Sequence, residues 1–183
     1  MTLLSTRRIH TGRIVSLDVD TVRFPNGNVG DLEMLRHPGA SAVLPFLDPV
    51  DAHDPRVLLI RQYRHATGDY LWEIPAGRRD GDEAPEATAR RELQEETGYQ
   101  ASHFEKLTSI WTTPGFTDEV IHLFLASGLT PGASALEADE VLDLHPLRWS
   151  VVLEMIHNGT ITDTKSMNAI LFVQGFVRQR LTN

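Results

Sequence analysis

Residues 77–99 read GRRDGDEAPEATARRELQEETGY, and this stretch concentrates the charge of the 183-residue chain. Three glutamates, Glu92, Glu95 and Glu96, lie within five positions of one another. Between residues 69 and 96 there are nine acidic residues against four arginines, so much of the net charge of −8 belongs to one segment. A charge run is usually a solvated surface, but like charges three or four residues apart repel one another on a helix. The stretch therefore predicts either an exposed face or a cation site.

Local signals predict a helix over residues 85–97. Pro85 suits the first helical turn, where the N–H that proline lacks is not needed, and Gly98 is a typical C-terminal stop. At about 100° per residue the three glutamates share a stripe about 100° wide, and Ala89 and Leu93 adjoin it. A row of carboxylates beside so narrow an apolar edge favours a site for a hard divalent cation such as Mg²⁺.

The spacing of the whole stretch resembles the Nudix box, G-x5-E-x7-R-E-U-x-E-E-x-G-U, in which U is a bulky aliphatic residue. The specified positions are filled by Gly77, Glu83, residues 91–93, residues 95–96 and Gly98. The final U is Tyr99, a departure that we expect to affect only packing. A match of this length is far more specific than a short glycine motif, so it favours the cation site over the exposed face.

The resemblance implies a fold, a reaction and a set of ligands. The fold class is α/β in the broad sense (α+β), an α/β/α sandwich around a mixed sheet. The reaction is hydrolysis of a nucleoside diphosphate linked to another group, with two or three Mg²⁺ or Mn²⁺ ions. By the same resemblance the metal ligands are the carbonyl of Ala76 and the side chains of Glu92, Glu95 and Glu96.

Three other residues of the box receive supporting roles from the resemblance. Gly77 lets the backbone approach the site closely, because it has no side chain. Arg91 orients Glu92 or a downstream acid through a paired hydrogen bond. Glu83 stabilises the loop before the helix and is not expected to touch the substrate.

The rest of the chain is mostly β in pattern. Residues 14–36 predict a hairpin around the turn at residues 25–28, and Pro38-Gly39 breaks the chain after it. Further strands are expected at residues 42–47, 57–63, 71–74, 104–111, 120–126 and 141–147. Ser150 is expected to cap a helix ending at His157, and Asp163 or Thr164 a last helix. We predict an N-terminal β subdomain (1–38) and a hydrolase domain (39–183).

Two segments outside the box resemble the ADP-ribose pyrophosphatase subgroup of the Nudix family. One is TTPGFTDE at residues 112–119, with its proline 15 positions after Tyr99, and the other is RQYR at 61–64 followed by LWEIPAG at 71–77. The subgroup implies a phosphate contact by Arg64, with Glu73 near the site. It implies a homodimer joined through residues 1–38. The remaining substrate-binding candidates are Gly77, Pro114, Gly115, Phe116 and Arg36.

The catalytic base stays open at this point. The subgroup supplies a glutamate from a loop some 40–45 residues after the box helix, which here is the LEADE segment at 136–140. Glu137 is the first candidate, Glu140 the second, and Asp139 lies between them. Two rivals, at positions 118 and 119, lie in the proline loop as Asp118 and Glu119.

Composition excludes several other classes. The chain has no cysteine, which excludes disulfides and thiolate metal sites, and it has neither a basic patch for nucleic acid nor an apolar run of about 20 residues. The N-terminus lacks the pattern of a secretory signal, so we expect a cytoplasmic protein without nucleic-acid or membrane partners. G-x-S-x-G, P-loop and H-E-x-x-H motifs are absent. The leading hypothesis is an ADP-ribose pyrophosphatase. The alternatives are hydrolysis of another nucleoside diphosphate sugar, such as GDP-mannose, and a non-catalytic ADP-ribose sensor.

Overall fold

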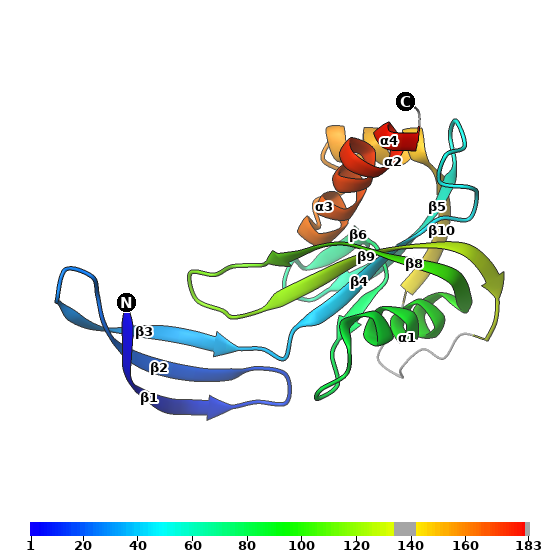
Figure 1. Ribbon diagram of the computed structural model, residues 1–183. Coiled ribbons are helices and arrows are strands. Elements are labelled where there is room, and N and C mark those ends of the chain that lie inside the picture. Colours follow the sequence, from blue (N-terminus) through cyan, green and yellow to red (C-terminus); the bar gives the residue numbers. More distant parts are fainter. Residues whose placement is uncertain (134–141, 182–183) are drawn as a thin grey trace.

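The computed structural model describes residues 1–133 and 142–181, and its centre is a four-stranded mixed sheet (Figure 1). The strand order is β7-β4-β9-β8, with bounds Ala76–Arg78, Ala40–Pro45, Val120–Pro131 and Tyr99–Trp111. β4 and β9 run parallel, while the outer pairs are antiparallel. Helix α1 (Pro85–Thr97) lies on one side of this sheet, and α2 (Trp149–His157) and α3 (Thr164–Phe172) lie on the other.

A second sheet carries the C-terminal helices. Its order is β10-β5-β6, with bounds Leu142–Arg148, Arg56–Arg64 and Asp69–Glu73, and all its pairs are antiparallel. A single bridge between Phe46 and Val57 connects the chain from β4 into this sheet. After α3 the chain continues as a π-helical stretch, η1 (Val173–Arg178), and a short α4 (Gln179–Leu181). The predicted sandwich around a mixed sheet is confirmed.

The core has two parts because successive residues of a strand point to opposite faces. Ala42 and Leu44 of β4 pack on the α2–α3 side, whereas Val43 packs against α1. On α1 only Ala89 and Leu93 enter the apolar cluster, and both are fully buried. The narrow apolar edge predicted for this helix is therefore enough to dock it.

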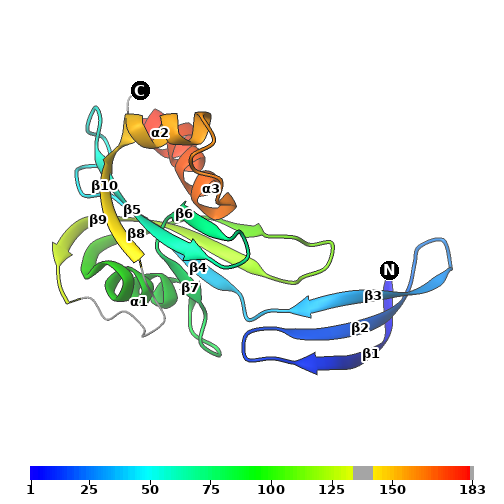
Figure 2. The same ribbon diagram turned by 180° about the vertical axis from the view of Figure 1, so that it is seen from behind.

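The hairpin expected over residues 14–36 is confirmed, and a further N-terminal strand extends it to a separate three-stranded antiparallel sheet. Its strands are β1 (Thr2–Thr11), β2 (Ser16–Arg23) and β3 (Val29–Arg36), in the order β1-β2-β3. Figures 1 and 2 show this sheet extending away from the rest of the molecule. β1 was missed because every one of its residues is exposed, so its sequence shows no apolar alternation.

The helix ends test the local signals directly. α1 begins at Pro85 and ends where Gly98 adopts φ 71°, as predicted. The side chain of Asp163 caps α3 by accepting a hydrogen bond from the Ser166 amide. The cap predicted at Ser150 is wrong, because α2 begins one residue earlier and both Ser150 donors are taken by the Asp54 carboxylate. No helix within residues 1–133 and 142–181 has the length and apolarity to cross a bilayer.

Candidate functional site

The loop before α1 is tied to the helix through Glu83. The Glu83 carboxylate accepts hydrogen bonds from the Arg91 guanidinium at 3.2 Å and from the Thr88 hydroxyl at 2.8 Å. The Glu83 carbonyl accepts two more from Arg79, at 2.9 and 2.7 Å. The hydrogen bond from Arg91 is the main reason that the pKa of Glu83 is lowered. Glu83 therefore fixes the loop, the role that the resemblance implied.

Glu92 lies against the backbone of β7. A Cβ atom built on Gly77 would lie under 3.0 Å from the carboxylate atoms of Glu92, a separation that real side chains do not show. The Glu92 side chain is only 8% exposed. Glycine at position 77 is therefore required for this carboxylate to occupy its place between α1 and the sheet.

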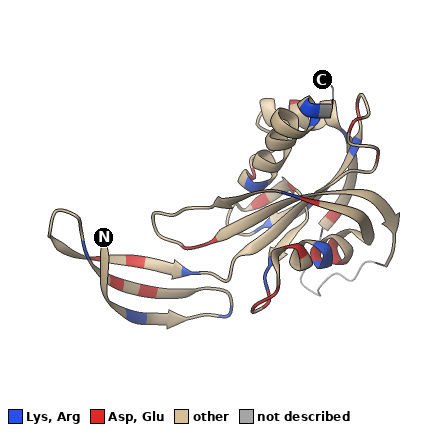
Figure 3. Ribbon diagram, in the orientation of Figure 1, with Lys and Arg blue, Asp and Glu red and all other residues tan. Residues whose placement is uncertain are grey.

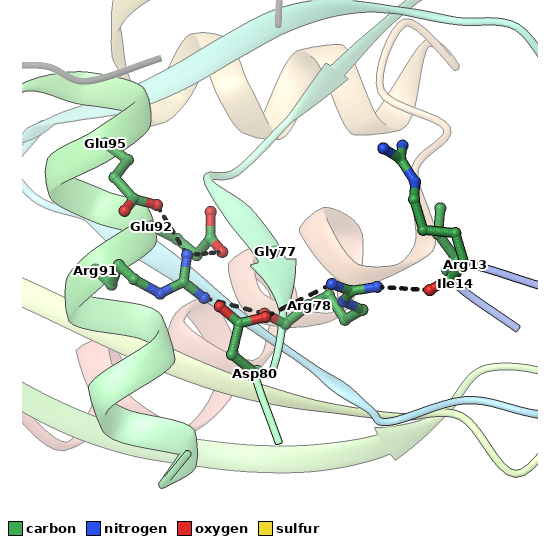
Figure 4. Close-up of a pocket in the computed structure, with 8 residues that line it drawn as sticks. All are labelled: Arg13, Ile14, Gly77, Arg78, Asp80, Arg91, Glu92 and Glu95. Atoms are coloured by element: carbon green, nitrogen blue, oxygen red, sulfur yellow. Dashed lines mark hydrogen bonds and ion pairs between the residues drawn. The ribbon is translucent and has the colours of Figure 1, made fainter. Parts of the chain in front are cut away.

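Arg91 holds two of the three box glutamates with one nitrogen. Its Nη1 donates to Glu92 Oε1 at 2.7 Å and to Glu95 Oε2 at 2.8 Å, as Figure 4 shows. Its Nη2 donates to the carbonyl of Arg78 at 3.0 Å. Burial alone would lower the pKa of Arg91, but the acids around it raise that pKa above the ordinary value. The sequence predicted repulsion among the glutamates, but in the structure the Arg91 guanidinium pairs with both Glu92 and Glu95 and offsets it.

Glu96 faces the same strand from the next turn of α1. Its Oε2 accepts the backbone N–H of Ala76 at 3.0 Å, and only 3% of the residue is exposed. The buried carboxylates of Glu92 and Glu96 thus lie against Gly77 and Ala76, two adjacent residues of β7. The side chain of Glu95 is more exposed. Figure 3 shows acidic and basic residues side by side along α1 and the loop before it.

The carboxylates of α1 fit a divalent cation by their donor chemistry. All the ligands offered are oxygens, as Mg²⁺ and Mn²⁺ prefer, and a side chain at position 77 would fill the space that Glu92 uses. In the part of the chain that the structure describes, no three His, Cys, Asp or Glu side chains converge as a preformed centre. In this structure the Arg91 guanidinium supplies the positive charge to Glu92 and Glu95.

A cavity of about 340 Å³ opens in front of these carboxylates. Its far wall comes from the turn between β1 and β2, where the carbonyl of Arg13 accepts a hydrogen bond from Arg78 at 3.2 Å (Figure 4). Neither arginine was predicted, because nothing in the sequence shows that the N-terminal turn folds back to this point. The lining residues are Arg13, Ile14, Gly77, Arg78, Asp80, Arg91, Glu92 and Glu95.

A second charged group joins β5, β6 and α3. Arg64 donates to both oxygens of Glu73, at 2.7 and 2.8 Å, and Lys165 forms an ion pair with the same carboxylate. Burial would raise the pKa of Glu73, but Arg64 and Lys165 together hold it below its ordinary value. The pKa of Arg64 is raised mainly by the hydrogen bond to Glu73, with the charge of Glu96 adding to it. Lys165 was missed because no motif surrounds it.

The loop between β8 and β9 contains the remaining described candidates. Pro114, Gly115 and Phe116 lie at its tip, and Phe116 is 50% exposed. Thr112 and Thr113 at the start of the loop line a cavity of about 210 Å³ together with Lys165 and neighbouring residues. The three acidic candidates at 137, 139 and 140 lie outside the described residues.

The three other acidic or basic candidates near this loop have partners within the protein. Arg36 forms ion pairs with Asp18, Asp20 and Asp118. Glu119 accepts a hydrogen bond from the Thr112 hydroxyl at 2.9 Å. These contacts place the rivals for the catalytic base, Asp118 and Glu119, in the joint between the loop and the N-terminal sheet.

Comparison with known proteins agrees with this geometry. A family model described as "NUDIX domain" matches residues 36–167. The chain belongs to the Nudix family. The predicted enzyme class, a Nudix hydrolase, is confirmed, and hydrolases of this family generally use divalent metal ions.

Relatives and one solved structure extend the likeness over nearly the whole chain. A "Methanol dehydrogenase activator" of Bacillus methanolicus is 40% identical over 173 residues, 93% of this chain and 91% of that protein. An "ADP-ribose pyrophosphatase" of Bacillus subtilis is 35% identical over the same shares. A "GDP-mannose pyrophosphatase" of Klebsiella pneumoniae is 36% identical over 67% of this Nudix chain and 66% of its own. A crystal structure of an "ADP compounds hydrolase" matches with a TM-score of 0.79 at 23% identity, covering 98% and 95% of the two chains, and shows the same fold.

Proposed function

We propose that this Nudix hydrolase cleaves the pyrophosphate of ADP-ribose, giving AMP and ribose 5-phosphate. The observation that carries the proposal is the pair of buried carboxylates, Glu92 and Glu96, held against β7 beside a cavity of about 340 Å³. Ligand pockets usually measure about 300–1,000 Å³, so this cavity suits a small molecule. The ADP-ribose pyrophosphatase of Bacillus subtilis, at 35% identity, supports the choice of substrate.

The metal ions of this proposal are Mg²⁺ or Mn²⁺, in a number of two or three. Glu92, Glu95 and Glu96, with the carbonyl of Ala76, would hold them. When bound, such ions supply positive charge that polarises phosphoryl oxygens and makes water more acidic. Arg91 would keep Glu92 and Glu95 oriented, since its Nη1 already contacts both.

The rest of the chemistry is positioning and proton transfer. Arg64 donates two N–H groups to Glu73 and its side chain is 40% exposed, so it is placed to contact a phosphate. Glu137, with Glu140 as the second candidate, would take the proton from the attacking water. Phe116, at the tip of the β8–β9 loop, offers an exposed aromatic face for the base or the ribose. Much of the catalysis of phosphoryl transfer comes from such positioning and charge stabilisation.

Assembly and location follow the sequence-based expectation of a cytoplasmic homodimer. The N-terminal sheet, with residues 1–38, would be the dimerisation subdomain. All ten residues of β1 are exposed, and one edge of this strand has no neighbour in the described sheet. An exposed edge strand is suited to pairing with another chain. Light scattering coupled to gel filtration would give a mass of about twice 20.5 kDa for the dimer.

A substrate panel tests the proposed activity. The purified protein with Mg²⁺ would be offered ADP-ribose, ADP-glucose and GDP-mannose, and the nucleoside monophosphate released would be quantified by chromatography. We expect the highest kcat/KM for ADP-ribose, with AMP and ribose 5-phosphate in equal amounts. An equal or higher kcat/KM for either other sugar nucleotide would overturn the assignment.

The second candidate function is hydrolysis of GDP-mannose. The Klebsiella pneumoniae relative named for that activity is 36% identical, although over a smaller share of this chain. The same panel decides between the two, because the GDP-mannose reading requires GMP as the main product. A panel without any turnover, combined with binding of ADP-ribose, would favour the non-catalytic sensor.

A further inference from the structure

The β8–β9 loop is joined to the N-terminal sheet by backbone hydrogen bonds. The N–H of Leu35 on β3 donates to the carbonyl of Phe116 at 2.8 Å, and the N–H of Asp118 donates to the carbonyl of Leu35 at 3.2 Å. These bonds make a short parallel bridge between residues 35 and 117. Residues 116–118 of the loop are therefore hydrogen-bonded to β3 of the N-terminal sheet.

The side chain of Asp118 adds two contacts to the same joint. Its Oδ1 accepts the backbone N–H of His37 at 2.8 Å, and its Oδ2 accepts Nη1 of Arg36 at 3.3 Å. The neighbouring Glu119 lies 3.3 Å from Nδ1 of His37. One carboxylate thus contacts both residues that follow Leu35, so Asp118 is the centre of the joint.

Arg36 is fixed from its other side. Its Nε donates to Asp18 at 3.1 Å, and its Nη2 forms an ion pair with Asp20. Asp18 and Asp20 are 3% and 8% exposed, and Arg8 on β1 pairs with Asp18 from the opposite direction. All three donor nitrogens of Arg36 are engaged within the protein. The guanidinium therefore links Asp118 of the loop to Asp18 and Asp20 of the N-terminal sheet.

The near side of the loop faces the charged group of the site. Thr112, Thr113 and Lys165 line the same cavity of about 210 Å³. Lys165 also pairs with the Glu73 carboxylate, which holds Arg64. A shift of the loop would change the shape of this cavity. The carboxylates of α1 do not line this cavity, so we expect them to keep their positions.

We propose that Asp118 is a positioning residue that clamps residues 112–119 to β3, so that the N-terminal sheet sets the affinity for substrate. The inference deepens the function proposed above and rests on it for the identity of the substrate. It assigns Asp118 to the loop and not to proton transfer. It also assigns Arg36 to the clamp in place of the substrate contact predicted from sequence.

Two variants test the clamp from its two sides. In Asp118→Asn the amide oxygen still accepts from the His37 N–H, but the charge that holds Arg36 is lost. Arg36→Met removes the guanidinium that pairs with Asp118. Arg36→Met also removes the ion pairs of Arg36 with Asp18 and Asp20. We expect each variant to raise KM for ADP-ribose about tenfold with kcat within about twofold. The double variant should raise KM no further than Arg36→Met, because both substitutions remove the same contact between Arg36 and Asp118. Arg8→Met is the matched control, since Arg8 pairs with Asp18 in the same sheet and does not touch the loop.

Hydrogen exchange provides a readout that needs no turnover. Without substrate, amides 112–119 of both clamp variants should exchange at least several-fold faster than in the native protein or in Arg8→Met, with exchange in α1 unchanged. Unaltered exchange in the loop would overturn the clamp. A hundredfold fall in kcat at constant KM in Asp118→Asn would instead make Asp118 the base. If the native protein does not hydrolyse ADP-ribose, the proposed function fails, and the exchange rates still decide the clamp.

Discussion

In this Nudix hydrolase the Glu92 carboxylate occupies the space that a side chain at Gly77 would fill. A Cβ atom at position 77 would lie under 3.0 Å from that carboxylate. The carboxylate lies against bare backbone, and α1 is docked closely enough to bury both Glu92 and Glu96. The glycine of the box is thus explained by packing against a functional side chain, not by backbone conformation. Its φ angle is outside the left-handed region, unlike that of Gly98.

The first prediction concerns Gly77→Ala. The added methyl group must displace the Glu92 side chain or move α1, and overpacking of this kind costs about 1–3 kcal/mol. We expect Tm to fall by a few degrees and kcat/KM to fall at least about tenfold, because a carboxylate is displaced from the proposed metal site. Differential scanning fluorimetry and the substrate assay would measure the two effects.

Gly175→Ala is the matched control for that substitution. Gly175 lies in η1, has an ordinary φ, and has open space around its Cβ position. This variant should keep native activity, and its Tm should not fall, because alanine favours helical structure over glycine. If Gly77→Ala also kept native activity and Tm, the activity would not depend on the present position of the Glu92 carboxylate.

The second prediction concerns Glu96→Gln. The glutamine oxygen can still accept the N–H of Ala76, so the fold should be kept, whereas a metal ligand loses its charge. We expect kcat to fall by at least about a hundredfold, since metal assistance is worth several kcal/mol. Mn²⁺ binding, followed by electron paramagnetic resonance, should weaken in parallel. Glu86→Gln is the control on the same helix, because Glu86 is exposed and pairs with Arg90. Retention of full activity by Glu96→Gln would remove Glu96 from the site.

The helix of the site was predictable from sequence because its signals are local. Pro85, Gly98 and the apolar pair Ala89 and Leu93 act within a few residues of one another, and α1 has the expected bounds. The resemblance to the box also implied a close approach of the backbone at Gly77, but it did not show that the Glu92 carboxylate fills that space. Spacing along a helix does not show that Glu92 and Glu95 share one nitrogen of Arg91, because that contact depends on side-chain geometry.

The features that were missed depend on partners elsewhere in the folded chain. β1 has no apolar alternation and exists because β2 offers it a partner, so its exposed sequence gave no strand signal. Lys165 reaches Glu73 across 92 residues of chain, and Asp118 reaches Arg36 across 82. Ion pairs of this kind depend on the packed arrangement of sheets and helices, which a single sequence does not display.

The third prediction concerns Lys165→Met. Glu73 is 1% exposed and would lose one of the two cationic partners it has among the described residues, and the ion pair of Lys165 with Asp163 would also be lost. We expect a loss of about 1–3 kcal/mol of unfolding free energy at pH 7. The pKa of Glu73 is lowered in the folded protein, so the stability that its charge provides is present above its unfolded pKa of about 4.3. That stability is lost as pH falls through the lower folded pKa.

The pH dependence separates this effect from simple loss of packing. The difference in unfolding free energy between native protein and Lys165→Met should be largest near pH 7 and shrink below about pH 4. Denaturant titrations at several pH values would measure it. Lys106→Met, at the only other lysine, is the control and should change little because that residue is exposed on β8. A pH-independent difference would contradict the role of the Glu73 charge.

The fourth prediction concerns the catalytic base, for which Glu137 is the first candidate and Glu140 the second. Glu137→Gln should lower kcat by about 10²–10⁴ with KM and Tm unchanged, the usual size of a general-base contribution. Glu140→Gln, in the same acidic segment, should lower kcat much less and serves as its matched control. Because glutamine preserves shape and removes only the proton acceptor, a fall confined to Glu140→Gln would transfer the role to Glu140. Full kcat in both variants would make Glu119, in the β8–β9 loop, the next candidate for the base. Glu119 contacts Thr112 and His37, so it would have to release one of these partners in order to accept a proton from water.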